Sequence, residues 1–145
     1  MEFKILIADA HEEFLDTMAL GLMRENYTPI LCINGNELMH ALRSDDMPCL
    51  VFLDIHMQEK DGIEVLKELA ALTKRIRVRF ITGGAIPHVI AAELIARSNG
   101  LDLGPTLYKP FSLARLVEVI KEDGELLFSA PKPQDPEGPQ QDIGP

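Results

Sequence analysis

Four polar side chains stand at the ends of short apolar runs, and their chemistry is that of a phosphate-handling site. Asp9 and Asp54 supply carboxylates, Thr82 supplies a hydroxyl and Lys109 supplies an ammonium group. A carboxylate can act as a nucleophile toward a phosphoryl group, and carboxylates with a backbone oxygen can hold a hard cation such as Mg²⁺. A hydroxyl and an ammonium group can bind phosphoryl oxygens. The set predicts phosphoryl chemistry if the fold brings the four together.

The apolar runs that position these residues predict the strands of a parallel sheet. Near-continuous apolar runs suit strands that are covered on both faces, and segments with helical spacing lie between them. The predicted strands are residues 3–8, 29–33, 49–53, 77–82 and 106–108. Strand and helix alternate five times, which predicts an α/β fold with a doubly wound five-stranded parallel sheet. Sites in such sheets form at the carboxyl ends of the strands, where the four polar side chains stand.

Capping residues predict where several helices begin and end. We expect Asn36 to cap the second helix and Ser112 to cap the last one. The fourth helix is expected to run from near Pro87 to Gly100, because proline is favoured in a first turn and glycine after a last turn. The last helix is expected to end near Gly124.

Length and composition predict one domain with a tail. The chain has 145 residues, and residues 131–145 hold five of its ten prolines without apolar periodicity. We therefore expect a domain at residues 1–124 and a Pro-rich tail at residues 125–145 that is extended or disordered. For residues 125–129, a last turn of helix and an edge segment folded back on the domain both remain open.

Charge and hydropathy exclude several classes of partner. The 14 basic and 23 acidic residues give a net charge of −9, whereas nucleic acid and anionic lipid are bound by clustered Lys and Arg. We therefore expect neither nucleic acid nor a membrane as a partner. There is no long apolar run and no signal peptide, so a cytoplasmic protein is expected. Cys32 and Cys49 lie in apolar runs and are expected to be buried thiols.

Several pieces of the chain resemble the receiver domain of bacterial response regulators, the CheY-like family. The pieces are ILIAD, FLDIHMQEKDGIEVLKEL, ITGG and YKPF, which fall in the family's order over roughly residues 3–123. The resemblance implies a flavodoxin-like (βα)5 sheet with the strand order 2-1-3-4-5. It also implies two-component signalling, in which a histidine kinase or phosphotransfer protein phosphorylates the domain. The modified domain would then change its binding to a downstream protein, which the sequence does not identify, or to a second copy of itself.

The resemblance assigns roles to the residues that match. Asp54 would be the phospho-acceptor, and any enzymatic activity would be limited to self-phosphorylation and autodephosphorylation. Thr82, Gly83 and Lys109 would bind the phosphoryl group. The peptide bond between Lys109 and Pro110 is expected to be cis.

The metal site departs from the family pattern. Mg²⁺ would be held by Asp9, Asp54 and the backbone carbonyl of His56. The family has two adjacent acids after the first strand, but here Ala10 stands where the second acid would be. Glu12 follows shortly after and is a candidate replacement ligand. The affinity for Mg²⁺ is therefore the open question of this sequence.

The switch surface departs from the pattern as well. The aromatic switch residue of the family falls at Thr106, and Tyr108 is the candidate that could take over part of this surface. Ala10 and Thr106 favour an alternative function, in which a degenerate receiver acts as a binding or dimerisation module without phosphotransfer. A flavin-binding protein of the same topology is disfavoured, because the acidic loop after the first strand would repel phosphate.

Overall fold

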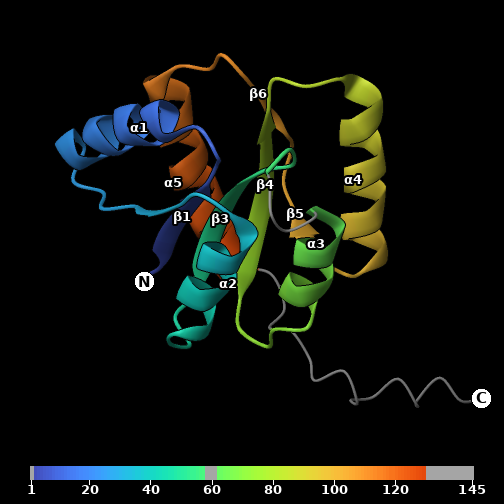
Figure 1. Ribbon diagram of the computed structural model, residues 1–145. Helices are drawn as coiled ribbons and strands as arrows, with labels where there is room; N and C mark the ends of the chain where they lie inside the picture. The colour runs from blue at the N-terminus through green and yellow to red at the C-terminus, as the bar shows by residue number, and fades with distance from the viewer. Residues whose placement is uncertain (1, 58–61, 130–145) are drawn as a thin grey trace, which may run out of the picture.

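A parallel sheet forms the centre of the molecule, with helices on both of its faces (Figure 1). The computed structural model describes residues 2–57 and 62–129. The strands lie in the order β2-β1-β3-β4-β5, with β6 also paired to β4, and all pairs are parallel as predicted. Their bounds are β1 (Lys4–Ala8), β2 (Ile30–Cys32), β3 (Cys49–Asp54), β4 (Ile76–Thr82), β5 (Asp102–Leu103) and β6 (Leu107–Tyr108).

The fifth position of the sheet is filled by two short strands instead of one. Both β5 and β6 pair with β4, so they follow one another along the same edge. Gly104 separates them, and a Cβ atom at Gly104 would lie 2.9 Å from guanidinium nitrogens of both Arg77 and Arg79. The two arginine side chains therefore cross the sheet edge at the glycine. The predicted strand at residues 106–108 is correct in place, but it begins one residue before β6, and the prediction misses β5.

Two apolar cores lie on opposite faces of the sheet. Alternate residues of β1 divide between them, with Leu6 in one core and Ile7 in the other, as side chains of a strand alternate between faces. One core is covered by α2, α3 and α4, and the other by α1 and α5. The helices are α1 (Glu12–Arg24), α2 (Gly35–Arg43), α3 (Gly62–Ala70), α4 (Ile86–Ser98) and α5 (Leu113–Ser129).

The helix caps confirm one prediction and correct another. The Ser112 hydroxyl accepts a hydrogen bond from the Arg115 N–H at 3.0 Å, as a capping residue should. The prediction of Asn36 as the cap of α2 is wrong, because Asn34 takes that place and accepts a bond from the Glu37 N–H at 2.8 Å. The Glu37 carboxylate accepts the Ile33 N–H in return, so a reciprocal capping arrangement determines the start of α2.

Helix α4 begins as the sequence predicts. Pro87 lies in its first turn, and Gly100 follows its C-terminus with a φ of 77°, a conformation that glycine adopts without strain.

Helix α5 is longer than predicted, since it continues through Gly124 to Ser129. Gly124 does not end the helix because the Phe3 ring packs against it, 2.8 Å from where a Cβ atom would stand. Leu127 is buried in the same core. Residues 125–129 are therefore the end of a helix, and the rest of the predicted tail, residues 130–145, lies outside the described residues.

Two smaller predictions concern the thiols and the membrane. Cys32 and Cys49 are buried free thiols, as expected, and burial raises the pKa of Cys32 to about 12. Among the described helices, none is both long enough and apolar enough to cross a membrane.

Candidate functional site

The four polar side chains predicted to converge do meet at the carboxyl edge of the sheet. Asp9 follows β1, Asp54 ends β3, Thr82 ends β4 and Lys109 follows β6. The Lys109 Nζ lies 2.5 Å from Oδ2 of Asp9 and 3.7 Å from Oδ2 of Asp54. Asp9, Asp54 and Thr82 are buried, with relative exposures of 0%, 4% and 0%. The ammonium group thus holds two buried carboxylates close together.

The same local turn positions the polar side chain at three strand ends. The His11 N–H donates to Oδ1 of Asp9 at 2.8 Å, and the His56 N–H donates to Oδ1 of Asp54 at 2.9 Å. The Gly84 N–H donates to the Thr82 hydroxyl at 2.9 Å. A side chain that accepts a bond from the backbone two residues on is a recurring turn of Asp and Thr. It aims each side chain across the edge of the sheet.

Lys109 is held by its backbone and by an aromatic ring. Its N–H donates to the Thr82 carbonyl at 2.8 Å, which extends the pairing of β6 with β4. Its Nζ lies 4.3 Å from the centre of the Phe14 ring, a cation–π contact. The Lys109–Pro110 peptide bond is cis, as expected. The ammonium group of Lys109 therefore has a defined position in the site.

The two carboxylates have different electrostatic surroundings. Burial alone would raise the pKa of Asp9, but hydrogen bonds from Lys109 and His11 and the Lys109 charge together hold it below its usual value. Burial raises the pKa of Asp54, as does the nearby charge of Asp9, and the opposing effects of the His56 N–H and of Lys109 are weaker. Asp9 is therefore the stabilised anion, whereas Asp54 carries the less stabilised carboxylate.

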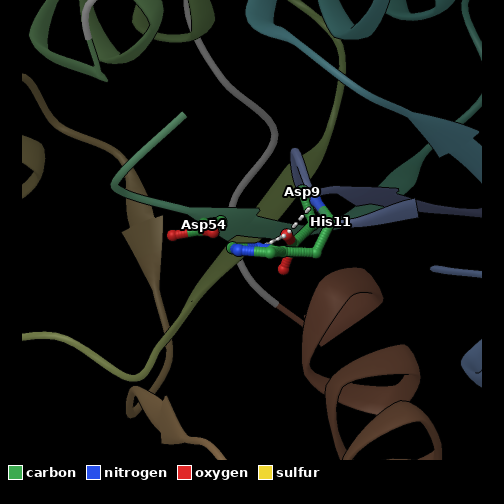
Figure 2. A group of neighbouring side chains, drawn as sticks. All are labelled: Asp9, His11 and Asp54. Atoms are coloured by element: carbon green, nitrogen blue, oxygen red, sulfur yellow. Dashed lines mark hydrogen bonds and ion pairs between the residues drawn. The ribbon is translucent and has the colours of Figure 1, made fainter. Parts of the chain in front are cut away.

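A histidine that the sequence prediction did not select completes the acidic site. In the described part of the chain, one group suits a metal ion: Asp9, His11 and Asp54, whose ligand atoms all lie within 4.8 Å of one another. Figure 2 shows the His11 ring alongside the Asp9 carboxylate and extending toward Asp54. Glu12, the candidate replacement ligand, is exposed in the first turn of α1 and is not a member of this group.

The sequence does contain a signal for His11. The triplets Asp-Ala-His and Asp-Ile-His end at His11 and His56, so each of the two acids of the site is followed two residues later by a histidine. Both histidines donate a backbone N–H to the acid that precedes them. This Asp-x-His repeat indicates His11 as a candidate ligand, which the pattern of acidic residues after the first strand does not.

His56 and His88 form a pair of histidine rings beside the acidic site. The rings of His56 and His88 are 5.6 Å apart, with an interplanar angle of 64°. The His56 ring also covers Gly84, where a Cβ atom would lie 2.2 Å from Nε2. At Gly83, by contrast, a Cβ atom would meet nothing closer than Lys109 at 3.9 Å. A Cβ atom at Gly84 would therefore displace the His56 ring, whereas Gly83 has room for one. The phosphoryl-binding role of Gly83 stays a prediction.

The predicted switch residues lie on the adjoining face. The Thr106 hydroxyl donates to Oε2 of Glu93 on α4 at 2.8 Å. Tyr108 is 48% exposed on β6. Thr106 thus ties the β5–β6 connection to α4, while the Tyr108 side chain is available at the surface.

Comparison with known proteins identifies the family. The model of the response regulator receiver domain matches residues 5–121. The chain belongs to the response regulator receiver family. A CheY-like receiver domain protein from Methanospirillum hungatei JF-1 is 22% identical, with a TM-score of 0.75 over 89% of this chain and 98% of that one. The recognition from sequence is therefore confirmed, and with it the role of the domain in two-component signalling.

Two further solved receivers share the fold. A response regulator from Burkholderia pseudomallei, with a phosphorylated aspartic acid, a calcium ion and citrate, is 23% identical (TM-score 0.66, 90% of this chain and 76% of that one). The beryllofluoride-activated NtrC4 receiver domain dimer is 24% identical (TM-score 0.69, 86% and 98%). At these identities the likeness establishes the fold alone, and the chemistry of the site has to be inferred from the residues of this receiver.

Proposed function

We propose that this receiver accepts a phosphoryl group on Asp54 from a histidine kinase or phosphotransfer protein. The observation that carries the proposal is the position of the Lys109 Nζ, 3.7 Å from the Asp54 carboxylate and 2.5 Å from the Asp9 carboxylate. A phosphoryl group on Asp54 would give the ammonium phosphoryl oxygens to bind besides the Asp9 carboxylate, and Thr82 ends the neighbouring strand β4. The proposed nucleophile and the proposed phosphoryl-binding groups thus lie at one edge of the sheet.

The transfer is a simple displacement at phosphorus. An Asp54 carboxylate oxygen forms a bond to phosphorus while the bond from phosphorus to the donor's imidazole nitrogen breaks, and the imidazole leaves with that electron pair. The raised pKa of Asp54 marks a carboxylate that the site stabilises weakly, which suits a nucleophile. The Lys109 ammonium and the Thr82 hydroxyl would bind oxygens of the transferred group.

The donor set at this edge fits a divalent cation. Two carboxylates and an imidazole have ligand atoms within 4.8 Å of one another. Asp9, Asp54 and the backbone carbonyl of His56 would hold Mg²⁺, with Glu12 as the exposed alternative. When bound, the cation would neutralise charge on the phosphoryl oxygens. The chain's own residues position those oxygens.

Phosphorylation would be transmitted through the face formed by α4, β6 and α5. The added charge of about −1.5 to −2 would draw Lys109 and Thr82 toward Asp54. On this face, Thr106 bonds to Glu93 of α4 and Tyr108 is exposed. Exposed apolar residues continue along α4, namely Ile86, Ile90 and Leu94. We propose that this surface binds a downstream protein or a second copy of this chain, and the NtrC4 receiver is one member of the fold that forms a dimer.

Mass measurement after incubation with acetyl phosphate and Mg²⁺ tests the proposal. We expect one added phosphoryl group on the unmodified chain and none on Asp54→Asn. A gain of mass that persists in Asp54→Asn would disprove the assignment of Asp54. No gain at any metal concentration would disprove phosphotransfer altogether.

The second candidate function is a receiver that binds partners without phosphotransfer. Ala10 favours it, because its exposed methyl group supplies no metal ligand where the family has an acid. Ala10→Asp separates the two functions. If the missing acid limits the site, this variant should bind Mg²⁺ more tightly and become phosphorylated faster than the unmodified chain. If both quantities are unchanged, another side chain already supplies the ligand.

A further inference from the structure

We propose that His11 is a ligand of the cation site, so that this receiver binds transition ions such as Zn²⁺ through one imidazole nitrogen and two carboxylates. The inference rests on the proposed function only in placing the cation beside Asp9 and Asp54. Their ligand atoms and that of His11 are mutually within 4.8 Å. A receiver site built from acids alone offers oxygen, whereas this site adds nitrogen.

The direction of the His11 ring is the first support. His11 occupies the N-cap position of α1, yet its side chain makes no capping hydrogen bond. The ring turns back toward the sheet instead, where Nδ1 lies 2.9 Å from Oδ1 of Asp9 (Figure 2). A polar side chain at the N-cap ordinarily satisfies the free N–H groups of the first turn. The structure shows this one directed at the acidic site.

The second support is the division of the Asp9 carboxylate between two partners. Lys109 bonds to Oδ2 at 2.5 Å, which leaves Oδ1 for His11 and for an ion. Two ligands that bind one Zn²⁺ ion with tetrahedral geometry and bonds of about 2.1 Å lie about 3.4 Å apart. Oδ1 and Nδ1 are in hydrogen-bond contact at 2.9 Å, so a small opening of this pair would bring both atoms to that separation. The His11 side chain is 74% exposed, so its ring can rotate to place a nitrogen in one coordination shell with the Asp9 and Asp54 carboxylates.

The chemical type of the donor atoms determines which ions bind more tightly when His11 is a ligand. Mg²⁺ prefers oxygen ligands in a near-octahedral arrangement, and Ala10 has removed one oxygen donor from the loop after β1. An imidazole nitrogen favours Zn²⁺ and other borderline transition ions. His11 should therefore contribute strongly to the binding of Zn²⁺ and weakly to that of Mg²⁺.

Calorimetric titration of the full chain with Zn²⁺ alone and with Mg²⁺ alone tests the role of His11. We expect His11→Ala to lower the affinity for Zn²⁺ by at least about ten-fold, and the affinity for Mg²⁺ by less than about three-fold. The matched control is His40→Ala, which removes an exposed histidine of α2 and should change neither affinity. In addition, Zn²⁺ should shift the ring ¹⁵N resonances of His11.

Two results would overturn the proposal. One is a Zn²⁺ affinity that is the same in His11→Ala as in the unmodified chain, which would mean that the ion binds elsewhere, for example at His56 and His88. The other is an equal loss of Zn²⁺ and Mg²⁺ affinity, which would make His11 a residue that only positions Asp9. Because no phosphodonor is present, the outcome does not depend on whether Asp54 accepts a phosphoryl group.

Discussion

Replacing Asp123 by asparagine should strongly destabilise the receiver, because it would leave two arginines without their buried anion. Asp123 lies on α5 and accepts two hydrogen bonds from Arg79 of β4, at 2.7 and 2.9 Å. Its Oδ1 is also 3.0 Å from Nε of Arg77, an ion-pair contact whose geometry is not that of a hydrogen bond. The side chains of Asp123 and Arg79 are only 2% and 4% exposed. Solvent therefore screens this pair weakly.

The size of the effect follows from this burial. Removing one member of a buried ion pair costs about 3 to 5 kcal/mol, because the other charge stays buried without compensation. With a urea dependence of about 2 kcal/mol per molar, the unfolding midpoint should fall by about 1.5 to 2.5 M. The paired replacement of Arg79 by Met and of Asp123 by Leu should lower the stability less, because it removes both charges of the pair together. Arg77 keeps its partner Asp102 at 2.7 Å in this variant.

Urea unfolding followed by circular dichroism provides the measurement. The matched control is Glu118→Gln, which breaks an exposed ion pair to Arg115 and should cost less than about 1 kcal/mol. A fall in midpoint of less than about 0.5 M for Asp123→Asn would refute the reasoning. So would a paired replacement less stable than Asp123→Asn alone, because the cost would then lie in packing and not in the orphaned charge.

Three further predictions follow from the site and from α5. Asp54→Asn should stabilise the fold at pH 7, because the raised pKa of Asp54 makes its ionisation costly in the folded state. This gain in stability should vanish below about pH 4, where Asp54 is protonated in both the folded and the unfolded chain. Thermal unfolding at the two pH values measures it, and an equal shift of the unfolding temperature at both would contradict the prediction. Leu127→Ala should cost about 2 to 5 kcal/mol in urea unfolding, and a cost below about 1 kcal/mol would mean that the end of α5 does not pack on the sheet. Gly84→Ala should displace the His56 ring from His88 with a stability change below about 1 kcal/mol, since His56 is exposed and can rotate; unchanged histidine ring resonances would contradict this.

The sheet and the position of the site could be predicted from sequence because both depend on local pattern. Apolar runs ending in Asp9, Asp54 and Thr82 locate strand ends, and parallel strands bring their carboxyl ends to one edge however the helices pack. The cap at Ser112 and the glycine after α4 are equally local. The cap of α2 was predicted at the wrong residue because the sequence holds two asparagines two positions apart, and Asn34, not Asn36, caps the helix.

What the sequence by itself determined is therefore which residue types stand at the carboxyl edge of the sheet, and in what order. Only the tertiary structure decided how the surroundings of these residues differ. The unequal pKa values of Asp9 and Asp54 arise from burial and from Lys109, which is far away along the chain yet in hydrogen-bond contact with Asp9. The continuation of α5 depends likewise on Phe3 packing against Gly124. The structure makes His11 a ligand candidate because its ring lies beside Asp9. The Asp-x-His spacing places a histidine after the acid, but the separation of a few ångströms between the ligand atoms is set by packing.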